Sequence, residues 1–327
     1  MKAAFYSANG PARDVLRIGD FPDPVAAPGE VLVQMAVSGI NPSDVKTRQG
    51  KTARPFEGSA RIPHNDGAGT IIAVGPDVDL GRIGQRVWVH NTNVTGVLGT
   101  AAELVAVPQN DAAVLPDKIS FEEAACFGVP LLTACHGVTI GGPVEGKWVF
   151  VSGGAGAVGN YAIQLAKALG ASVISSVSSD AKADAAREAG ADFALNYRTE
   201  NIVERVAEIT HGRGVDHYVE VNLTANAGSL HDLLAIGATV AIYGSDSPMA
   251  TLDAGKLRVK LIGLHFYNVY ALPADILAAS KAALLPILET GFIRTRIAER
   301  FTLEDIIEAH EAVESGKLIG NAVIRIN

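Results

Sequence analysis

The sequence predicts an α/β protein in which a β-rich segment precedes a doubly wound parallel sheet. Over residues 1–110, short Val- and Ile-rich segments alternate with turn residues. After about residue 120, apolar strands and helical patterns alternate as far as residue 268. The composition of 34 glycines and 6% aromatic residues also favours many tight strand–helix turns. A chain of 327 residues can form two domains of the usual size, roughly 100–200 residues each.

The first segment is expected to form a small barrel or sandwich. Its apolar runs are short, follow one another closely and are rich in β-branched residues, as strands joined by β-turns are. Gly, Pro and Asp residues over 75–87 supply turn chemistry between two of these runs. The expected strands are residues 30–40, 69–75, 85–90 and 101–108.

The second segment is expected to begin with a helix over residues 120–138. Ser120 is its predicted N-cap, and Glu122 and Glu123 lie in the first turn, where the helix dipole favours acidic side chains. Strands are then expected at 147–153, 171–179, 192–197, 215–221 and 238–244, and helices at 157–170, 180–190, 199–212 and 227–237. Such alternation predicts right-handed βαβ crossovers. The tail adds two helical patterns, 273–289 and 302–315, and a last strand, 320–327.

Charge and cysteine content exclude several classes of protein. The net charge of −8 and the pI near 5.5 disfavour a nucleic-acid partner. Cys126 and Cys135 are the only two cysteines, which indicates a reducing compartment rather than a disulfide framework. The N-terminus lacks a signal-peptide pattern, and no apolar run reaches the roughly 18 residues of a membrane span. We therefore expect a cytoplasmic protein without a membrane partner.

The stretch "VFVSGGAGAVGNYAIQLAKALG" (149–170) predicts a dinucleotide site. Gly154, Gly156 and Gly159 fit the pattern GxGxxG between an apolar strand and an amphipathic helix. Glycines let the backbone turn sharply and approach a pyrophosphate, while the helix N-terminus offers free N–H groups to phosphate. The strand, the helix and the βα units that follow favour this interpretation over a purely structural turn.

The end of the next strand indicates NADP(H) rather than NAD(H). NAD sites usually place an acidic residue there to bind the ribose 2′-hydroxyl. This chain has "VISSVSSDAK", in which serines and Val177 occupy the expected positions. Ser178 can hydrogen-bond a 2′-phosphate, and Lys182 and Tyr197 can reach it. Asp180 is the one acidic residue nearby, and its place suits a helix N-cap or first turn.

These motifs resemble the medium-chain dehydrogenase/reductase superfamily, and most of all its zinc-independent quinone oxidoreductase (zeta-crystallin-like) branch. The resemblance runs nearly end to end. It rests on "GINPSDVKTRQG" (39–50), "GTIIAVGPDV" (69–78), "PLLTA" (130–134), "GGAGAVG" (153–159), "AGADFALNY" (189–197), "NYRTENIVERV" (196–206) and "GKLIGNAVIRIN" (316–327).

The resemblance implies a GroES-like catalytic domain over 1–124, completed by 269–327, and a Rossmann NADP-binding domain over 125–268. It also implies an active site in the cleft between the domains and a homodimer or homotetramer. Catalytic roles would fall to Asn41, beside the nicotinamide, and to Lys46. The implied cofactor contacts are Asn41, Thr133, Gly154, Ala155, Gly156, Ala157, Val158, Gly159, Ser178, Lys182, Tyr197, Asn226, Tyr243, Gly244, Ser245, Asp246, Leu264, His265 and Phe266.

Zinc-dependent members of the superfamily bind the metal through Cys, His and Cys. The corresponding residues here are Asn41, Asn65 and Val129. An amide is a poor zinc ligand and valine is none, so no metal is expected. The chain departs from the quinone reductases at Lys46 and Cys135, where tyrosine is common.

The expected activity is therefore hydride transfer from NADPH to an electron-poor small molecule, with a quinone as the first candidate. Reduction of α,β-unsaturated ketones, or of other carbonyl or enoyl substrates, is the alternative, and a non-catalytic nucleotide- or RNA-binding relative is a third. Asn41 and nearby backbone are candidate donors to developing negative charge. Lys46 is either a cationic stabiliser or proton source, or a solvated surface residue. His265 is a candidate substrate-side group, whereas Cys135 and His136 are adjacent on a helix and should point apart.

Overall fold

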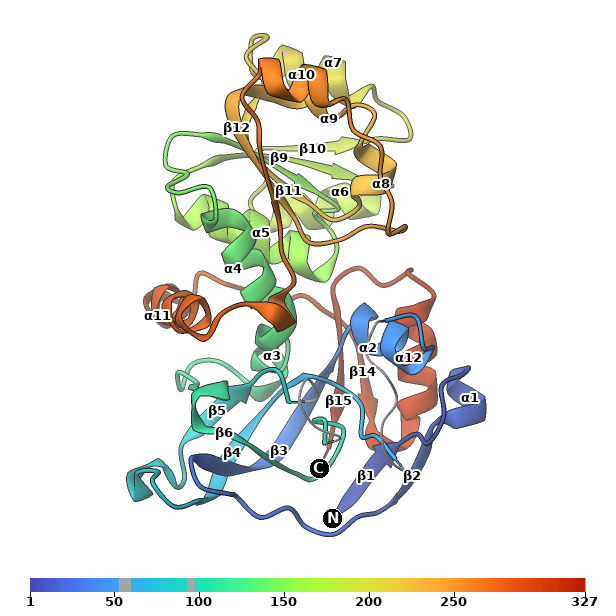
Figure 1. Ribbon diagram of the computed structural model, residues 1–327, viewed down its shortest axis with the longest axis vertical. Helices are drawn as coiled ribbons and strands as arrows, with labels where there is room; N and C mark the ends of the chain where they lie inside the picture. Colours follow the sequence, from blue (N-terminus) through green and yellow to red (C-terminus); the bar gives the residue numbers. More distant parts are fainter. Residues whose placement is uncertain (53–59, 93–97, 327) are drawn as a thin grey trace. The chain divides into compact units, whose positions relative to one another are not determined.

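The computed structural model describes residues 1–52, 60–92 and 98–326, and the chain divides into two compact units (Figure 1). The first comprises Met1–Val129 and Thr295–Asn327, and the second Pro130–Arg294. The segment 269–294 was expected in the first domain but lies in the second unit. Its helix α11 (Ala274–Thr290) contacts α4 (Leu132–Thr139), and Cys135 Sγ lies 3.9 Å from the Ser280 carbonyl oxygen.

The first unit is built on a seven-stranded sheet. Its order is β14 (Ile297–Thr302), β15 (Asn321–Arg325), β3 (Glu30–Ile40), β4 (Asp66–Val74), β5 (Arg86–Val89) and β7 (Ala112–Val114), with β6 (Leu104–Pro108) paired to β3. The pairs are antiparallel except β14 with β15. A separate antiparallel pair joins β1 (Lys2–Phe5) and β2 (Arg17–Asp20). The four strands expected in this segment are confirmed.

Strand β3 changes its environment along its length. In the first half, Val31, Val33 and Met35 are buried in the barrel core, while the residues between them are more exposed, as period-2 alternation predicts. From Ser38 to Ile40 every residue is buried. The C-terminal end of β3 is therefore covered on both faces, and it leads directly into Asn41.

Short helices complete this unit. They are α1 (Ala12–Val15), α2 (Pro42–Arg48), α3 (Phe121–Ala124), α12 (Ile306–Glu314) and the 3₁₀ turns η1 (Leu80–Arg82), η2 (Gln109–Asp111) and η5 (Leu303–Asp305). The helical pattern at 302–315 is confirmed by η5 and α12. Helix α2 was not predicted, although its signals are present: Asn41 is the N-cap and Pro42 the first helical residue.

The second unit contains a six-stranded parallel sheet in the order β10-β9-β8-β11-β12-β13. The strands are β8 (Trp148–Ser152), β9 (Ser172–Val177), β10 (Phe193–Asn196), β11 (Val215–Glu220), β12 (Leu234–Ile242) and β13 (Gly263–Phe266). Numbered from β8, this is the dinucleotide-fold order 3-2-1-4-5-6. The strand order reverses between β8 and β11, which is where such sheets bind ligands.

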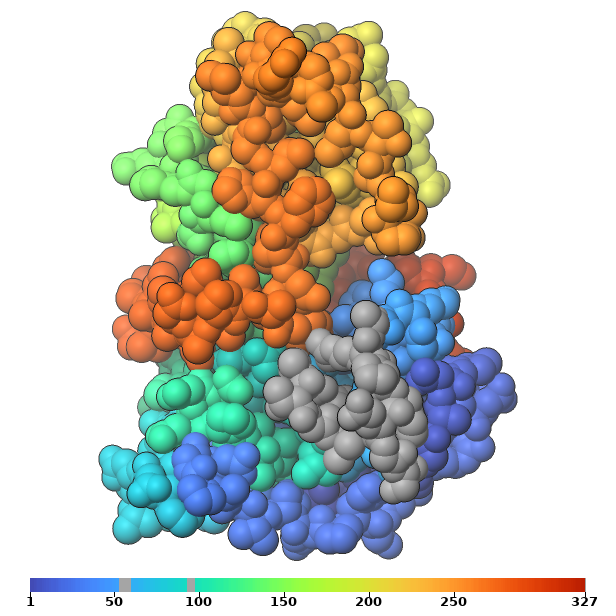
Figure 2. All heavy atoms as spheres, in the orientation of Figure 1, coloured from blue at the N-terminus to red at the C-terminus, as the bar shows by residue number. Residues whose placement is uncertain are grey.

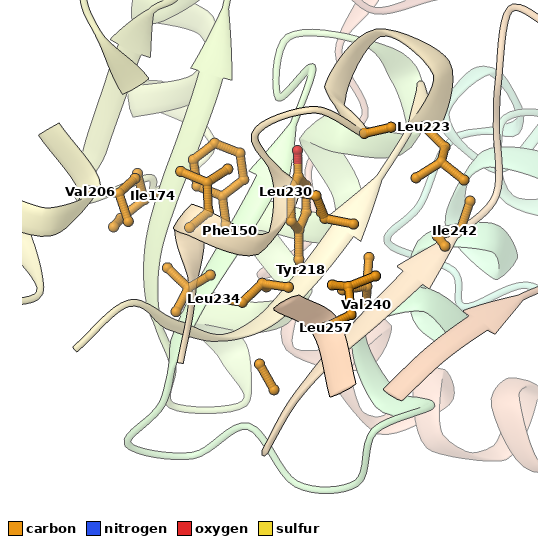
Figure 3. Close-up of a cluster of buried hydrophobic side chains, with 14 of the residues drawn as sticks. Phe150, Ile174, Val206, Tyr218, Leu223, Leu230, Leu234, Val240, Ile242 and Leu257 are labelled. Carbon is orange, nitrogen blue, oxygen red and sulfur yellow. The ribbon is translucent and has the colours of Figure 1, made fainter. Parts of the chain in front are cut away.

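Helices cover both faces of this sheet. The helices are α4, α5 (Ala157–Ala168), α6 (Asp180–Glu188), α7 (Ile202–Ile209), α8 (Leu223–Asn226), α9 (Leu230–Leu233) and α10 (Ala254–Val259), followed by the 3₁₀ turn η4 (Val269–Ala271) and α11. Helix α5 contacts α4 and α6, whereas α7 contacts α9. Figure 3 shows a cluster in which Phe150, Tyr218 and Leu230 pack together. Helix α10 lies on the surface (Figure 2). Of its residues, only Leu257 is buried.

Two predicted helices are shorter than expected. The segment 120–138 begins at the predicted N-cap, where Ser120 Oγ accepts from the Glu123 N–H. It then passes through a π-helical turn, Phe127–Leu131, because Pro130 has no N–H to continue a regular helix. The segment 227–237 forms only α9, because its last residues begin β12 at Leu234. Among the described residues, no helix has the length and apolarity needed to cross a bilayer.

A buried chain of hydrogen bonds ties α12 to the barrel. The Thr100 hydroxyl donates to the Asp66 carbonyl oxygen at 2.6 Å. With that proton used, Thr100 accepts from Ser38 (Oγ1–Oγ 2.7 Å), and Ser38 in turn accepts from His64 Nδ1 at 2.8 Å. A neutral His64 then has a bare Nε2, which accepts from His310 Nε2 at 3.2 Å. Because the Asp66 carbonyl oxygen can only accept, it determines the direction of every hydrogen bond in this series, and so which ring nitrogen carries the proton in His64 and in His310.

Both histidines of this chain are held neutral. Burial lowers the pKa of His64 to about 3. Burial, with His64 and Arg48 nearby, lowers the pKa of His310 well below its usual range. Their rings stack with centroids 5.2 Å apart, and within the described residues His310 Nδ1 has no hydrogen-bond partner. Protonating either ring would bury a charge or place two N–H donors face to face.

We predict that this pair makes the fold sensitive to acid. Unfolded histidines titrate near 6.5, so the stability that the neutral pair contributes is complete above that pH and is lost as pH falls toward 3. Each histidine should contribute a slope of about 1.4 kcal/mol per pH unit. Urea unfolding between pH 7.5 and 5 should show a smaller slope for His310→Leu than for wild type, because the contribution of one buried neutral histidine is removed. His211→Asn, at an exposed histidine, is the control, and equal slopes for wild type and His310→Leu would contradict the prediction.

Candidate active site

The residues around "RIPHNDGAG" form a buried polar cluster in the first unit. Asn41 follows the end of β3, and Asn65 and Asp66 stand at the start of β4. The antiparallel register pairs Gly39 with Asp66, which brings these two strand ends together. Asp44, in the first turn of α2, completes the cluster, and all four polar side chains are at most 4% exposed.

Two carboxylate–carboxamide pairs organise this cluster. Asn41 Nδ2 donates to Asp66 Oδ1 at 2.8 Å, and Asn65 Nδ2 donates to Asp44 Oδ1 at 2.8 Å. Asp44 Oδ2 also accepts from the Asn41 backbone N–H at 2.8 Å. Because a carboxylate only accepts, each pair fixes which way its amide points. Asn65 Oδ1 is consequently turned away from Asp44, and it is buried without a hydrogen-bond partner in the described part of the chain.

Asp66 lies in a tightly closed environment. Its Oδ2 accepts from the Val129 backbone N–H at 3.0 Å. Burial, followed by the nearby charge of Asp44, raises the pKa of Asp66 well above its usual range. Glycines make the approach possible: a Cβ on Gly39 would lie 2.7 Å from Asp66 Oδ1, and one on Gly128 would lie 2.4 Å from the Asp66 Cβ.

The cluster occupies the positions where zinc-dependent relatives are expected to hold their metal. Asn41 and Asn65 direct their amide nitrogens to carboxylates, and the Val129 side chain has no donor atom. Over residues 1–52, 60–92 and 98–326, no group of three or more His, Cys, Asp or Glu side chains is arranged to bind a metal ion. This donor set does not fit a catalytic zinc site, which needs three good N, S or O ligands.

Lys46 and Cys135 have different surroundings. Lys46 is exposed on the last turn of α2. Cys135 is buried in α4, and burial raises the pKa of its thiol to about 11, so it is protonated at neutral pH. His136 turns to Tyr267, with ring centroids 4.8 Å apart, so the two neighbours point apart as expected. Cys126 and Cys135 are both free thiols, and neither has the lowered pKa of a nucleophile.

In the second unit, the three glycines of the GxGxxG turn have different roles. A Cβ on Gly154 would lie 2.0 Å from Ser175 Oγ, and one on Gly159 would lie 2.3 Å from the Gly153 carbonyl oxygen. These two are needed for packing. Gly156 is exposed, has an ordinary backbone (φ −77°), and its Cβ would meet only the Gly153 oxygen, at 3.3 Å. The fold does not require glycine at 156, and the free space lies at the N-terminus of α5, where phosphate binds in such folds.

Glu220 is a buried residue of this unit that the sequence analysis missed. It ends β11, beside β8 at the point where the strand order reverses, and its side chain has no solvent exposure. Its Oε1 accepts from Ser152 Oγ at 2.9 Å and from the Asn222 N–H at 2.5 Å. Asn226 Nδ2 reaches both carboxylate oxygens, at 3.0 and 2.9 Å. The available signal was an acidic residue at the C-terminal end of an apolar strand, although the same strand also carries Asp216.

The loops after β11 and β12 are joined by hydrogen bonds. The Tyr243 N–H donates to the Glu220 carbonyl oxygen at 3.1 Å, and the Asp246 N–H to Asn222 Oδ1 at 3.2 Å. The Thr224 N–H donates to Ser245 Oγ at 3.3 Å. The structure thus brings Asn226 and the run 243–246, both named by the sequence analysis, to one edge of the sheet.

A second group of expected residues lies at the end of the sheet. Leu264, His265 and Phe266 belong to β13, and Phe266 is 65% exposed. The next residue, Tyr267, donates its hydroxyl proton to the Thr133 carbonyl oxygen at 2.8 Å. Thr133 is therefore linked to the strand that carries the other three, through a tyrosine that the sequence analysis did not single out.

The third group surrounds the ends of β9 and β10. Ser179, not Asp180, caps α6, because its Oγ accepts from the Lys182 N–H at 3.4 Å. Asp180 lies in the first turn of α6, one of the two places expected for it. The Tyr197 N–H donates to the Val177 carbonyl oxygen at 3.0 Å, which continues the β9–β10 register and places Tyr197 beside Ser178.

We predict that exchanging Asn41 and Asp66 will show that stability depends on pairing an amide with a carboxylate, and not only on which residue stands at each position. Asn41→Asp places two buried carboxylates together and should destabilise the fold by about 3 kcal/mol or more. Asp66→Asn offers an amide where both Asn41 and Val129 donate, so one N–H must lose its acceptor unless the Asn41 amide turns over. The double variant restores one amide and one carboxylate. Urea unfolding should show it to be more stable than Asn41→Asp alone, and additive losses would contradict the pairing.

Known proteins resemble this chain over its whole length. The family profile described as "Alcohol dehydrogenase GroES-like domain" matches residues 27–117, and that described as "Zinc-binding dehydrogenase" matches residues 157–281. A quinone oxidoreductase of Salmonella typhimurium is 32% identical over 330 residues, 98% of each chain. A 2-methylene-furan-3-one reductase of Solanum lycopersicum is 29% identical, over 99% of this chain and 79% of that protein.

A solved structure, Escherichia coli quinone oxidoreductase complexed with NADPH, covers 100% of both chains at a TM-score of 0.86 and 27% identity. Together with the parallel sheet and the barrel, these matches show that the chain belongs to the medium-chain dehydrogenase/reductase superfamily, in its quinone oxidoreductase branch.

Proposed function

We propose that this chain is an NADPH-dependent reductase that transfers hydride to a quinone without a metal ion. The observation that carries the proposal is the contrast between its two polar sites. One combines a glycine turn at the strand-order reversal with open space at Gly156. The other fills the expected metal positions with asparagines bound to carboxylates. Without a metal ion to polarise the substrate, hydride transfer from NADPH suits an acceptor that is already electron-poor.

The nucleotide would lie along the C-terminal edge of the parallel sheet. Gly154 to Gly159 would hold the pyrophosphate at the N-terminus of α5, where the exposed Gly156 leaves room. Ser178, Lys182 and Tyr197 would surround the adenosine 2′-phosphate. The remaining contacts are proposed for Thr133, Asn226, Tyr243, Gly244, Ser245, Asp246, Leu264, His265 and Phe266. Bound NADPH would supply the hydride, and these residues would orient it.

Asn41 and Lys46 are the proposed catalytic residues. The Asn41 amide has one N–H committed to Asp66, and its second N–H remains as a donor to an oxygen that gains negative charge. Lys46 is exposed and can supply a positive charge or a proton. Reduction of a quinone to a hydroquinone consumes one hydride and one proton. NADPH would supply the hydride, and the solvent-accessible Lys46 would supply the proton.

Enone reduction is the second candidate function. It is favoured by the likeness to the 2-methylene-furan-3-one reductase. Hydride would then add to the carbon β to the carbonyl, and a proton to the α carbon. The same cofactor geometry and the same donor to the carbonyl oxygen would serve both reactions, so the acceptor decides between them.

The proposed activity predicts NADPH oxidation that depends on an acceptor. Absorbance at 340 nm should fall with 1,4-benzoquinone and stay constant without it, with NADPH used faster than NADH. Adding an α,β-unsaturated ketone series tests the second candidate on the same preparation. Cofactor binding without reduction of any acceptor would overturn the catalytic proposal. Stoichiometric zinc in the purified active protein would overturn the metal-free part.

The glycine turn gives a prediction with an internal control. Gly156→Ala should lower the unfolding temperature by only a few degrees, because it replaces the N-cap of α5 and its new Cβ meets one protein atom, the Gly153 carbonyl oxygen at 3.3 Å. It should weaken NADPH binding by about tenfold or more, because the methyl group occupies the space proposed for the pyrophosphate. Gly255→Ala, at an exposed glycine of α10 whose Cβ would also meet one atom at 3.3 Å, should leave NADPH affinity unchanged. Equal affinities, measured by NADPH fluorescence titration, would contradict the placement.

A further inference from the structure

Asn196 holds an acidic and a basic residue at the end of β10. Its side chain is buried, at 9% exposure. Its Nδ2 donates to Asp180 Oδ1 at 3.2 Å, and its Oδ1 accepts from the Arg198 N–H at 3.2 Å. A carboxylate cannot donate and a backbone N–H cannot accept, so these two partners fix the amide in one orientation. The Asn196 N–H donates in addition to Glu200 Oε1 at 2.8 Å.

The direction of the Asn196–Asp180 hydrogen bond is set by the strand order. Strand β10 is at the edge of the sheet, and β9 separates it from β8 and its glycine turn. Asp180 follows β9 but bonds to a residue of β10. Its carboxylate is therefore drawn toward the edge of the sheet, on the opposite side of β9 from the glycine turn. An acidic residue after this strand usually does the reverse and binds the ribose 2′-hydroxyl of NAD.

We propose that Asn196 is a positioning residue that sets the preference for NADPH over NADH by keeping the Asp180 carboxylate away from the nucleotide. The inference rests on the proposed function, since it concerns the 2′-phosphate end of that nucleotide site. If the carboxylate were released, it could accept from a 2′-hydroxyl and would repel a 2′-phosphate. Asn196 thus removes the one feature at this position that would favour NADH.

The other charged groups at this edge agree with the assignment. The carboxylate of Glu200 accepts from Arg205 Nε at 3.2 Å, in addition to the Asn196 N–H. Over the ranges that the structure describes, neither the Lys182 ammonium nor the Arg198 guanidinium has a side-chain partner, and Arg198 is exposed. The Asp180 carboxylate keeps its negative charge, but because it is held by Asn196, the side chains left free to reach a 2′-phosphate beside Ser178 and Tyr197 are basic, as such a group requires.

A double-mutant cycle tests this inference. The variants are Asn196→Ala, Asp180→Asn and the two combined, with Asn201→Ala as control, because Asn201 caps the neighbouring helix α7 without touching Asp180. The readout is the NADPH/NADH ratio of kcat/KM, and the NADPH/NADH ratio of the association constant (1/Kd) from fluorescence titration, on one preparation of each variant. Such a ratio cancels losses of folded protein, so a merely structural effect does not change it.

Asn196→Ala should lower the ratio by about fivefold to tenfold, through weaker NADPH binding, because the freed carboxylate is close to the phosphate. Asp180→Asn should keep or raise the ratio, and adding it to Asn196→Ala should restore the ratio to within about twofold of Asp180→Asn alone. Asn201→Ala should leave the ratio unchanged.

Two results would overturn the inference: an unchanged ratio in Asn196→Ala, or an equal loss in the presence of Asp180→Asn. The second would mean that the turn carrying Tyr197 and Arg198 had moved. If no acceptor is reduced by any variant but the Kd ratios follow the predicted cycle, the proposed reductase activity fails while the role of Asn196 stands. A wild type that binds NADH more tightly than NADPH would overturn both.

Discussion

The structure depends on a single requirement, that a buried carboxylate must receive hydrogen bonds. Asparagine meets this requirement at Asp66, Asp44 and Glu220, through Asn41, Asn65 and Asn226. Unpaired buried charges are costly, and a neutral amide offers an N–H without adding a second charge that must itself be desolvated. Because a carboxylate only accepts, each pair also fixes the orientation of its amide, and so determines which atom the asparagine can offer to a ligand.

The same requirement explains how an acid-rich cluster can be held together in the barrel by hydrogen bonds. A metal ion would draw its ligands together by coordination. In this chain the strand ends of β3 and β4 and the first turn of α2 are joined by hydrogen bonds of 2.8 Å instead. The close approach of Gly39 and Gly128 to Asp66 shows that the backbone packs around this arrangement.

Much of the fold could be predicted from the sequence because its signals are local. The alternation of β3, the N-cap at Ser120 and the glycine turn after β8 each depend on residues within a few positions of one another. The predicted helix at 227–237 was mostly wrong because an apolar run such as "LLAI" suits a buried strand as well as a helix. The candidate site was harder to predict. Glu220 and Ser152 are 68 residues apart, and no periodicity indicates that two such side chains will meet.

The histidine chain of the barrel has a consequence for how protons can move. It runs from His310 through His64, Ser38 and Thr100, and it ends on the carbonyl oxygen of Asp66 rather than on the carboxylate. A peptide oxygen can accept a hydrogen bond but cannot take up and pass on a proton at ordinary pH. This series of hydrogen bonds therefore cannot conduct a proton, although histidine and hydroxyl side chains form proton relays in other proteins. A proton from His310 therefore cannot reach the Asp66 carboxylate along these hydrogen bonds.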